Sequence, residues 1–253
     1  MAFPRRGGVT VEHDAGLSQE GKTRVSGLRG VSPIDHVFFD LDGTLADSLP
    51  GIRYAVEEAL AGLSVPRTCP DLRDLIGPPI RSILSVLAPQ ATEACLDRLE
   101  RGFRLAYDRD GWSKTAAYPG ALDAIAGLAR AGKTLFLVTN KPRHVTLKVS
   151  ELLRMRELFS AILTRDSKEP PYESKGAMLR CILSLHGVHP ATCLMVGDAL
   201  EDCEAAAHAG MRAAVMLHGY GARRVPRGRP GWRLVNGFEE LAALCLGKED
   251  WDD

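Results

Sequence analysis

The stretch of sequence that decides the fold is Phe38-Phe39-Asp40-Leu41-Asp42-Gly43-Thr44-Leu45. An apolar run ends there in two carboxylates separated by one residue, and a Gly-Thr pair follows. Because side chains alternate along a strand, Asp40 and Asp42 begin on the same face, and a turn at Gly43 frees the end of the strand. The two acids can therefore reach one site at the carboxyl end of an apolar strand, where open α/β sheets bind their ligands.

Downstream of this stretch, short apolar strands alternate with amphipathic helices. The strands that we expect, including the first one, span 34–39, 134–138, 161–163, 193–196, 213–217 and 234–235. The helices that we expect between and after them span 121–131, 143–153, 175–185, 202–209 and 238–246. This alternation predicts an α/β fold with a doubly wound parallel sheet and right-handed crossovers.

Residues 50–115 interrupt the alternation. Apolar side chains recur there at helical spacing over about 50–60, 81–87 and 96–107, and nothing in the interval has the pattern of a strand. The sequence therefore predicts a helical insertion after the first strand. The resulting domain prediction is an α/β core of 34–49 and 116–247, a helical insertion of 50–115, a flexible N-terminal extension of 1–33 and an acidic tail of 248–253.

The composition is typical of a soluble globular protein. The 253 residues are 45% hydrophobic and 25% charged, with 32 basic and 32 acidic side chains, so no field of the whole chain attracts nucleic acid or a membrane. A basic N-terminal arm for nucleic acid is the less favoured interpretation of the extension. There is no apolar run of the roughly 18 residues that a membrane helix needs, and no signal-peptide core. Six cysteines without a Cys-x-x-Cys pair indicate reduced thiols and a cytoplasmic protein.

Polar residues also follow three other strands of the predicted sheet. Thr139-Asn140-Lys141 follows one strand, Lys175 opens the helix after Ser174, and Asp198 follows another strand with Asp202 beyond it. If the sheet is parallel, all of these residues lie at the same edge as Asp40 and Asp42. Each residue alone also fits a helix cap, a turn or a solvated charge. Their common order along the chain favours a functional site.

This set of side chains suits phosphoryl transfer. The carboxylates expected at the edge are Asp40, Asp42, Asp198 and Asp202. They would repel one another unless a cation lay between them, and Mg²⁺ prefers such oxygen ligands and is usually shared with a substrate phosphate. The Thr139 hydroxyl and the Lys175 ammonium can then neutralise the remaining phosphoryl oxygens. Asp40 can attack phosphorus to give an aspartyl-phosphate, and Asp42 can protonate the leaving alcohol and later deprotonate water.

The ordered set resembles the four motifs of the haloacid dehalogenase superfamily of phosphohydrolases, over about residues 34–246. The resemblance is greatest to its phosphoglycolate phosphatase-like branch. It is carried by Asp40-Leu41-Asp42-Gly43-Thr44-Leu45-Ala46-Asp47-Ser48, Ile76-Gly77-Pro78-Pro79, Val138-Thr139-Asn140-Lys141-Pro142, Val196-Gly197-Asp198 with Asp202, and His218-Gly219-Tyr220-Gly221. The resemblance implies a Rossmann-like core and a cap, formed by residues 50–115, that closes over the site. It also implies that Mg²⁺ is held by Asp40, the Asp42 backbone carbonyl and Asp198, with Asp202 supporting.

The phosphate-binding lysine has two candidates. Relatives commonly carry Lys-Pro where this chain has Lys175-Gly176, and Lys168 stands just upstream in Lys168-Glu169-Pro170. We expect Lys175 to bind phosphate because it opens an amphipathic helix after a Ser174 cap, and Lys168 is the alternative. The substrate-binding residues that we expect are Thr139, Asn140, Lys175 and Arg81. For Arg81, which could engage an anionic leaving group from the cap, an ordinary solvated arginine is the favoured alternative.

Single residues separate the activities of this superfamily. Dehalogenases and phosphonate hydrolases that resemble this fold lack the second acid, whereas this chain has Asp42. Sugar-phosphate mutases carry a basic residue in the first cap helix, near the position of Ile52. Mg²⁺-dependent hydrolysis of a small phosphate monoester, such as a phosphoglycolate-like metabolite, is therefore the predicted function. The alternatives are a sugar-phosphate mutase or pyrophosphatase of the superfamily and a non-catalytic regulatory or binding module. The exact substrate and the oligomeric state stay open.

Overall fold

The core of the protein is a six-stranded parallel sheet, described here from a computed structural model that covers residues 32–61, 71–249 and 251. The order of the strands is β5-β4-β1-β6-β7-β8. Their bounds are Ala161–Thr164 (β5), Thr134–Thr139 (β4), His36–Phe39 (β1), Cys193–Gly197 (β6), Arg212–Met216 (β7) and Trp232–Val235 (β8). The first strand in sequence thus pairs in parallel with β4 on one side and β6 on the other. The predicted doubly wound α/β sheet is confirmed.

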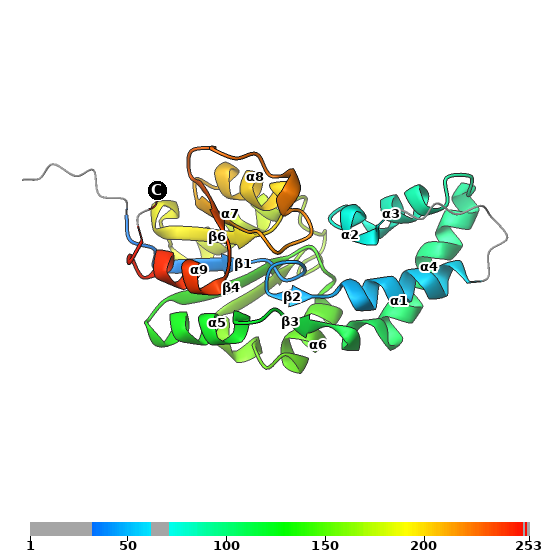
Figure 1. Ribbon diagram of the computed structural model, residues 1–253, viewed down its shortest axis with the longest axis horizontal. Coiled ribbons are helices and arrows are strands. Elements are labelled where there is room, and N and C mark those ends of the chain that lie inside the picture. Colours follow the sequence, from blue (N-terminus) through cyan, green and yellow to red (C-terminus); the bar gives the residue numbers. More distant parts are fainter. Residues whose placement is uncertain (1–31, 62–70, 250, 252–253) are drawn as a thin grey trace, which may run out of the picture. The chain divides into compact units, whose positions relative to one another are not determined.

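Helices cover both faces of the sheet, as Figure 1 shows. The helices are α5 (Ala121–Arg130), α6 (Arg143–Leu152), α7 (Lys175–His186), α8 (Leu200–His208) and α9 (Phe238–Cys245). Phe39 belongs to the apolar cluster shared with α5, α6 and α9, whereas its neighbour Phe38 belongs to the cluster shared with α7 and α8. This division follows from the two-residue period of a strand. It explains why β1 is apolar at successive positions, as parallel strands buried on both faces are.

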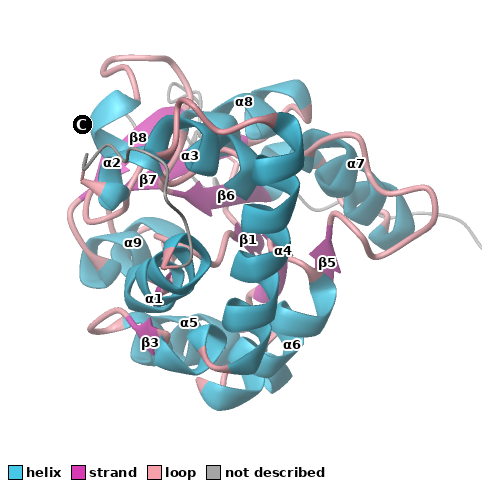
Figure 2. Cartoon of the chain, turned by 90° about the vertical axis from the view of Figure 1, so that its right-hand side faces the viewer, coloured by secondary structure: helices cyan, strands magenta, loops and turns pink. Residues whose placement is uncertain are grey.

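The insertion, residues 50–115, is helical. Its main helices are α1 (Leu49–Leu60), α2 (Leu72–Leu75), α3 (Ile80–Leu87) and α4 (Glu93–Arg109), and no strand occurs among the described residues of 50–115. Figure 2 views the molecule from the side of these helices. A separate apolar cluster, which includes Val56, Leu84 and Leu99, joins α1, α3 and α4. The insertion therefore has a small hydrophobic core of its own.

Some elements differ from the sequence prediction. The helix α2 was not expected, and neither was the antiparallel pair β2 (Ala46–Asp47) and β3 (Ala116–Ala117), which joins the two ends of the insertion. Two-residue strands and a single helical turn are too short to produce a periodic pattern. The last strand begins at Trp232, inside a stretch whose prolines and glycines suggest a loop.

Two predictions fall partly or wholly outside the described residues. Residues 1–31 of the proposed N-terminal extension lie outside the described residues. Residues 250 and 252–253 of the proposed acidic tail also lie outside them. In the part of the chain that the structure describes, every helix is too short or too polar to span a lipid bilayer.

Candidate active site

The site lies at the carboxyl ends of the central strands. The Asp40 amide, just past β1, donates a hydrogen bond to the Val196 carbonyl of β6 at 2.9 Å, which places the first acid beside the neighbouring strand. Gly43 then turns the chain with a φ of 83°, a conformation that suits glycine. A Cβ on Gly43 would lie 2.6 Å from Asp198 Oδ2. Glycine is therefore needed here both for the turn and for the close approach of the fourth motif.

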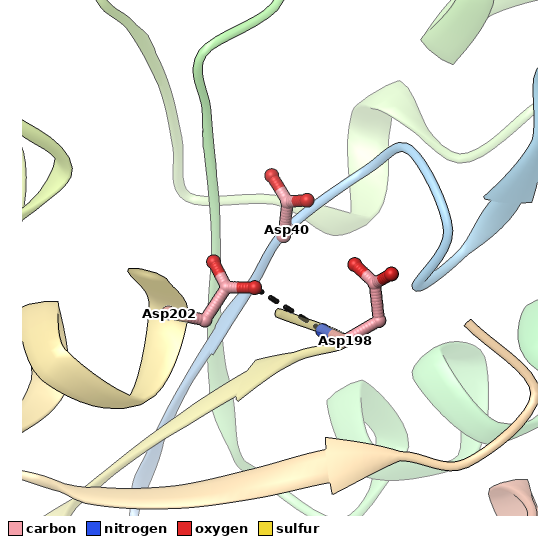
Figure 3. Close-up of side chains that lie close together, drawn as sticks. All are labelled: Asp40, Asp198 and Asp202. Carbon is pink, nitrogen blue, oxygen red and sulfur yellow. Dashed lines mark hydrogen bonds between the residues drawn. The ribbon is translucent and has the colours of Figure 1, made fainter. Parts of the chain in front are cut away.

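Three aspartates form the centre of the site. Asp40, Asp198 and Asp202 each offer one oxygen, and these oxygens all lie within 4.8 Å of one another. The three residues are only 7%, 4% and 1% exposed, respectively. Figure 3 shows that their carboxylates are turned to the same side. The structure thus brings together three of the four carboxylates that the sequence predicted at this edge.

Burial makes this cluster electrostatically unfavourable when no cation is bound. Burial, with repulsion from the neighbouring carboxylates, raises the pKa of Asp40 to about 7 despite the attraction of Lys175. Burial and Asp202 likewise raise the pKa of Asp198 to about 6. Asp40 Oδ1 is buried and accepts no hydrogen bond of suitable geometry, although the Lys175 ammonium forms an ion pair with it at 3.0 Å. A set of buried, hard oxygen donors that resist ionisation fits a divalent cation such as Mg²⁺.

Asp202 supports the turn that carries Asp198. Its Oδ2 atom accepts hydrogen bonds from the amides of Asp198, at 3.1 Å, and Ala199, at 3.0 Å. These bonds satisfy free amide groups before the first turn of α8. Asp198 is held on its other side by the Gly221 amide, which donates to Asp198 Oδ2 at 2.9 Å. The fourth motif is therefore fixed by its own helix and by the loop after β7.

Lys175 lies among the carboxylates. It is the first residue of α7, and the preceding Ser174 caps that helix by accepting a hydrogen bond from the Ala177 amide. The Lys175 ammonium lies 3.0 Å from Asp40 Oδ1 and 2.5 Å from Asp202 Oδ1. Burial alone would lower the pKa of Lys175, but attraction to Asp202 and Asp40 outweighs it and raises the pKa. Lys175 therefore stays a cation in contact with the predicted nucleophile.

The alternative lysine has a different partner. The Lys168 ammonium lies over the ring of Tyr172, 4.5 Å from its centroid. Lys175 is the candidate that the structure brings to the aspartates. The role of either lysine in binding phosphate stays a prediction.

The end of β4 and the loop after it contribute the hydroxyl of Thr139 and the side-chain amide of Asn140. Thr139 ends β4, is only 2% exposed, and its hydroxyl accepts a hydrogen bond from the Lys141 amide at 3.3 Å. The side chain of Asn140 donates to Glu201 Oε1 at 2.9 Å, which ties the loop after β4 to the first turn of α8. Both residues lie at the strand-end edge, as the sequence predicted.

Asp42 is turned toward partners that the sequence did not assign. Its two carboxylate oxygens lie 2.9 Å and 3.0 Å from the Lys141 ammonium, and that ammonium also donates to the Tyr107 hydroxyl at 2.7 Å. Lys141 lies two residues after Thr139, so its position beyond a strand end was a usable signal. Tyr107 gave no signal, because an aromatic residue at helical spacing in α4 is typical of a core residue.

Arg81 has partners within the insertion. Its guanidinium pairs with three carboxylates, those of Glu93 at 2.5 Å, Asp97 at 2.7 Å and Glu100 at 3.4 Å. These contacts join α3 to α4, and none of them involves a residue of the aspartate cluster. The structure does not bring Arg81 together with the other predicted residues, and its part in substrate binding stays a prediction.

The loop after β7 connects the core with the insertion. The Tyr220 hydroxyl donates to Asp47 Oδ1 at 2.7 Å and accepts from the Ser48 amide at 2.9 Å, at the start of α1. From α2, the Arg73 guanidinium donates to the His218 carbonyl at 2.6 Å. The sequence could assign the motif His218-Gly219-Tyr220-Gly221 only by resemblance. In the structure this motif contacts the start of α1 and also α2.

Comparison with known proteins agrees with this geometry. A family model described as haloacid dehalogenase-like hydrolase matches residues 34–210. The chain is 31% identical over 193 residues to a phosphoglycolate phosphatase of Psychrobacter arcticus, covering 73% of this chain and 84% of that protein. It is 35% identical over 189 residues to a phosphoglycolate phosphatase of Cereibacter sphaeroides, covering 73% and 85% of the two proteins.

A solved structure supports the same assignment. The crystal structure of a protein from Haemophilus somnus 129pt, described as a predicted phosphoglycolate phosphatase, superposes with a TM-score of 0.74 and 25% identity. The superposition covers 87% of this chain and all (100%) of that one. The resemblance stated from the motifs, and the predicted class of enzyme, a phosphoric monoester hydrolase, are confirmed. The chain therefore belongs to the haloacid dehalogenase-like hydrolases, in their phosphoglycolate phosphatase-like branch.

Proposed function

We propose that this chain is a Mg²⁺-dependent phosphatase that hydrolyses a small phosphate monoester through an aspartyl-phosphate intermediate. One observation carries the proposal: the buried Asp40 carboxylate lies 3.0 Å from the Lys175 ammonium and within 4.8 Å of oxygens of Asp198 and Asp202. A nucleophile, a phosphate-binding cation and metal ligands are thus gathered at one strand edge. Phosphoryl transfer needs mainly such positioning and charge neutralisation.

The metal would be held by Asp40, Asp198 and the backbone carbonyl of Asp42, with Asp202 supporting them. When bound, Mg²⁺ would neutralise the carboxylates and the charge on the phosphoryl group. The buried acceptor Asp40 Oδ1 and the raised pKa values of Asp40 and Asp198 support this assignment. In the metal-free protein Lys175 alone provides positive charge in contact with Asp40 and Asp202 among the described residues.

The reaction would run in two balanced steps. Asp40 attacks phosphorus, the bond from phosphorus to the ester oxygen breaks, and Asp42 gives its proton to the leaving alcohol. Water then attacks the aspartyl-phosphate, gives a proton back to Asp42 and releases phosphate with Asp40 restored. Through both steps the Thr139 hydroxyl and the Lys175 ammonium would donate hydrogen bonds to phosphoryl oxygens.

The helical insertion would act as a cap. We assign residues 50–115 to the cap and 34–49 with 116–247 to the core. The contacts of Arg73 and Tyr107 with the core support a cap that covers the site. The names of the relatives favour a small phosphorylated acid such as phosphoglycolate as the substrate. The five described cysteines, all unpaired thiols, agree with a cytoplasmic location.

The test is turnover of a panel of phosphate esters by the full chain with and without Mg²⁺. The panel contains 2-phosphoglycolate, other small phosphorylated acids, nucleotides, pyrophosphate and p-nitrophenyl phosphate. We expect Mg²⁺-dependent release of phosphate from a small monoester and its loss in Asp40→Asn, because the amide is a poor nucleophile. A phosphorylated protein trapped by acid quenching should carry its phosphate on Asp40. Full activity of Asp40→Asn with the native fold would contradict the mechanism.

A further inference from the structure

Lys141 joins the proposed acid–base residue to the helical cap. Its ammonium group contacts both oxygens of Asp42, at 2.9 Å and 3.0 Å, and the hydroxyl oxygen of Tyr107, at 2.7 Å. The three residues come from three separate parts of the chain: the loop after β4, the loop after β1, and α4. The ammonium group thus directs its hydrogen-bond donors to one carboxylate and one phenol.

This contact differs from an ordinary surface ion pair. The Lys141 side chain is 5% exposed, so its charge is largely removed from water, which is costly unless a partner compensates for it. The Asp42 side chain is 21% exposed, so it is less buried than the ammonium that it contacts. The arrangement is a buried cation paired with a partly accessible carboxylate.

Tyr107 is itself held firmly. It is 6% exposed, and its ring stacks on that of Phe103 with the centroids 5.5 Å apart. On another side the chain comes so near that a Cβ on Gly111 would lie 2.7 Å from Tyr107 Cδ2. The phenol oxygen is thus a fixed point on α4, and it limits where the Lys141 ammonium can lie.

We propose that Lys141 is a positioning residue for Asp42 and that Tyr107, from the cap, fixes Lys141 in the position where it holds the Asp42 carboxylate for proton transfer. This inference rests on the proposed function, since it concerns the delivery of a proton to the leaving alcohol. It adds a role for two residues, one in the core and one in the cap. Their described contacts include neither the three clustered carboxylates of Asp40, Asp198 and Asp202 nor Lys175. Seating of α4 against the core would then be a condition for proton transfer.

The proposal has a specific kinetic consequence. An alkoxide leaves slowly unless it receives a proton, so cleavage of an alkyl phosphate depends on the position of Asp42. The p-nitrophenolate ion leaves without a proton, so formation of the aspartyl-phosphate from p-nitrophenyl phosphate does not depend on it. Hydrolysis of the aspartyl-phosphate needs Asp42 as a base with either ester. Misplacing Asp42 should therefore slow the first step for one ester only and the second step for both.

The test compares the native chain with Tyr107→Phe, Lys141→Met, Lys141→Arg and the double variant Tyr107→Phe/Lys141→Met. The matched controls are Tyr54→Phe, which removes a phenol that bonds within the cap to Asp110, and Lys133→Met, which removes a partly buried lysine at the amino end of the sheet. The esters are p-nitrophenyl phosphate and the alkyl phosphate of the panel that the native chain hydrolyses fastest. Thermal unfolding is recorded for each variant.

We expect Lys141→Met to lower kcat for the alkyl phosphate on the order of 10²-fold with little change in KM, which is within the range of general acid–base catalysis. Tyr107→Phe should have a smaller effect in the same direction, and Lys141→Arg should restore part of the rate. With p-nitrophenyl phosphate these variants should show a rapid burst of product followed by a slow steady state. The double variant should be no slower than Lys141→Met, because the two residues act as a unit. The controls should match the native chain.

Other results would overturn the inference. Native kcat values in Tyr107→Phe and Lys141→Met, or losses that appear only in KM or in thermal stability, would show a merely structural ion pair. If Lys141→Met does not fold, Tyr107→Phe decides alone, since its ring keeps the packing. Failure of this inference can be distinguished from failure of the proposed function. If only the inference fails, the native chain hydrolyses esters and Asp40→Asn does not. If the proposed function fails, the native chain hydrolyses none of the esters.

Discussion

At the scale of single residues, two glycines show how closely the chain packs around Asp198 and Asp202, which belong to the proposed metal site. A Cβ on Gly219 would lie 2.1 Å from Asp198 Cβ, and one on Gly197 would lie 2.2 Å from Asp202 Cγ. Real Cβ contacts are never so short, so these glycines are required by the space they leave to the aspartates. The backbone at the end of β6 and in the loop after β7 is thus shaped around the carboxylates of Asp202 and Asp198.

We predict that Gly219→Ala weakens the binding of Mg²⁺ by about 10–100-fold, because the added methyl group must displace Asp198, and supporting residues of metal sites have effects of this size. Titration of the protein with Mg²⁺ by calorimetry measures the change. The matched control is Gly237→Ala, where nothing lies within 4 Å of the added Cβ. Equal Mg²⁺ affinities in Gly219→Ala and the native chain would show that Asp198 is not a ligand in its observed position.

The position of a candidate site residue could be predicted from the sequence where the backbone decides that position. Asp40 and Asp198 directly follow parallel strands and Thr139 ends one. The carboxyl ends of parallel strands meet at one edge of the sheet whatever side chains they carry. The partner of Asp42 was not predictable, because a long lysine side chain can reach many acceptors. The same holds for Arg81, whose three carboxylate partners depend on how α3 and α4 pack.

At the scale of elements, the start of α7 places a positive charge where a helix favours a negative one. The first turn of a helix has free amide groups and a partial positive charge, so a lysine there is unfavourable unless carboxylates compensate for it. Asp40 and Asp202 provide that compensation at 3.0 Å and 2.5 Å. The first turn of α7 therefore depends for its stability on the residue that follows β1 and on the first turn of α8.

We expect Lys175→Met to abolish turnover of the preferred ester, because it removes the cation that would hold the phosphoryl oxygens beside Asp40. Lys168→Met should keep the native rate, since Lys168 contacts the ring of Tyr172 instead. Steady-state kinetics at saturating Mg²⁺ separates the two variants. The reverse pattern would identify Lys168 as the phosphate-binding lysine.

The elements themselves were predictable to the extent that they are long and apolar. The strand β4 and the preceding helix α5, which ends just before Gly132, have clear periodic patterns. The strand β8 was placed too late, because Pro230 and Gly231 immediately before Trp232 suggested that the loop continued. The pair of two-residue strands β2 and β3 exists only through contact with each other, which no local pattern records.

At the scale of the whole molecule, the aspartate cluster should make stability depend on pH when no metal is present. Asp40 has a pKa of about 7 in the folded protein against 3.8 as its ordinary value, so the folded state binds more protons than the unfolded state between these values. The free energy of unfolding must then fall as the pH rises through this interval. The shift corresponds to on the order of a few kcal/mol.

We predict that the metal-free protein is more stable to urea at pH 5 than at pH 7.5, and that Mg²⁺ removes much of this difference by neutralising the cluster. Asp40→Asn carries no titrating group at this position, so its stability should fall less over the same interval. Urea denaturation of both proteins at several pH values, in EDTA and in Mg²⁺, measures the effect. A native protein whose stability rises with pH in EDTA would contradict the raised pKa of Asp40.

The central position of β1 also has a consequence for the synthesis of the protein. The strand β1, which ends just before Asp40, is translated before the other strands of the six-stranded sheet, but both of its neighbours, β4 and β6, lie far downstream. Until β6 leaves the ribosome, β1 has an unpaired, strongly apolar edge, which favours association with other chains or capture by chaperones. Asp40, the proposed nucleophile, is thus made well before Lys175, Asp198 and Asp202. Catalysis should begin only after α8 has been made and folded.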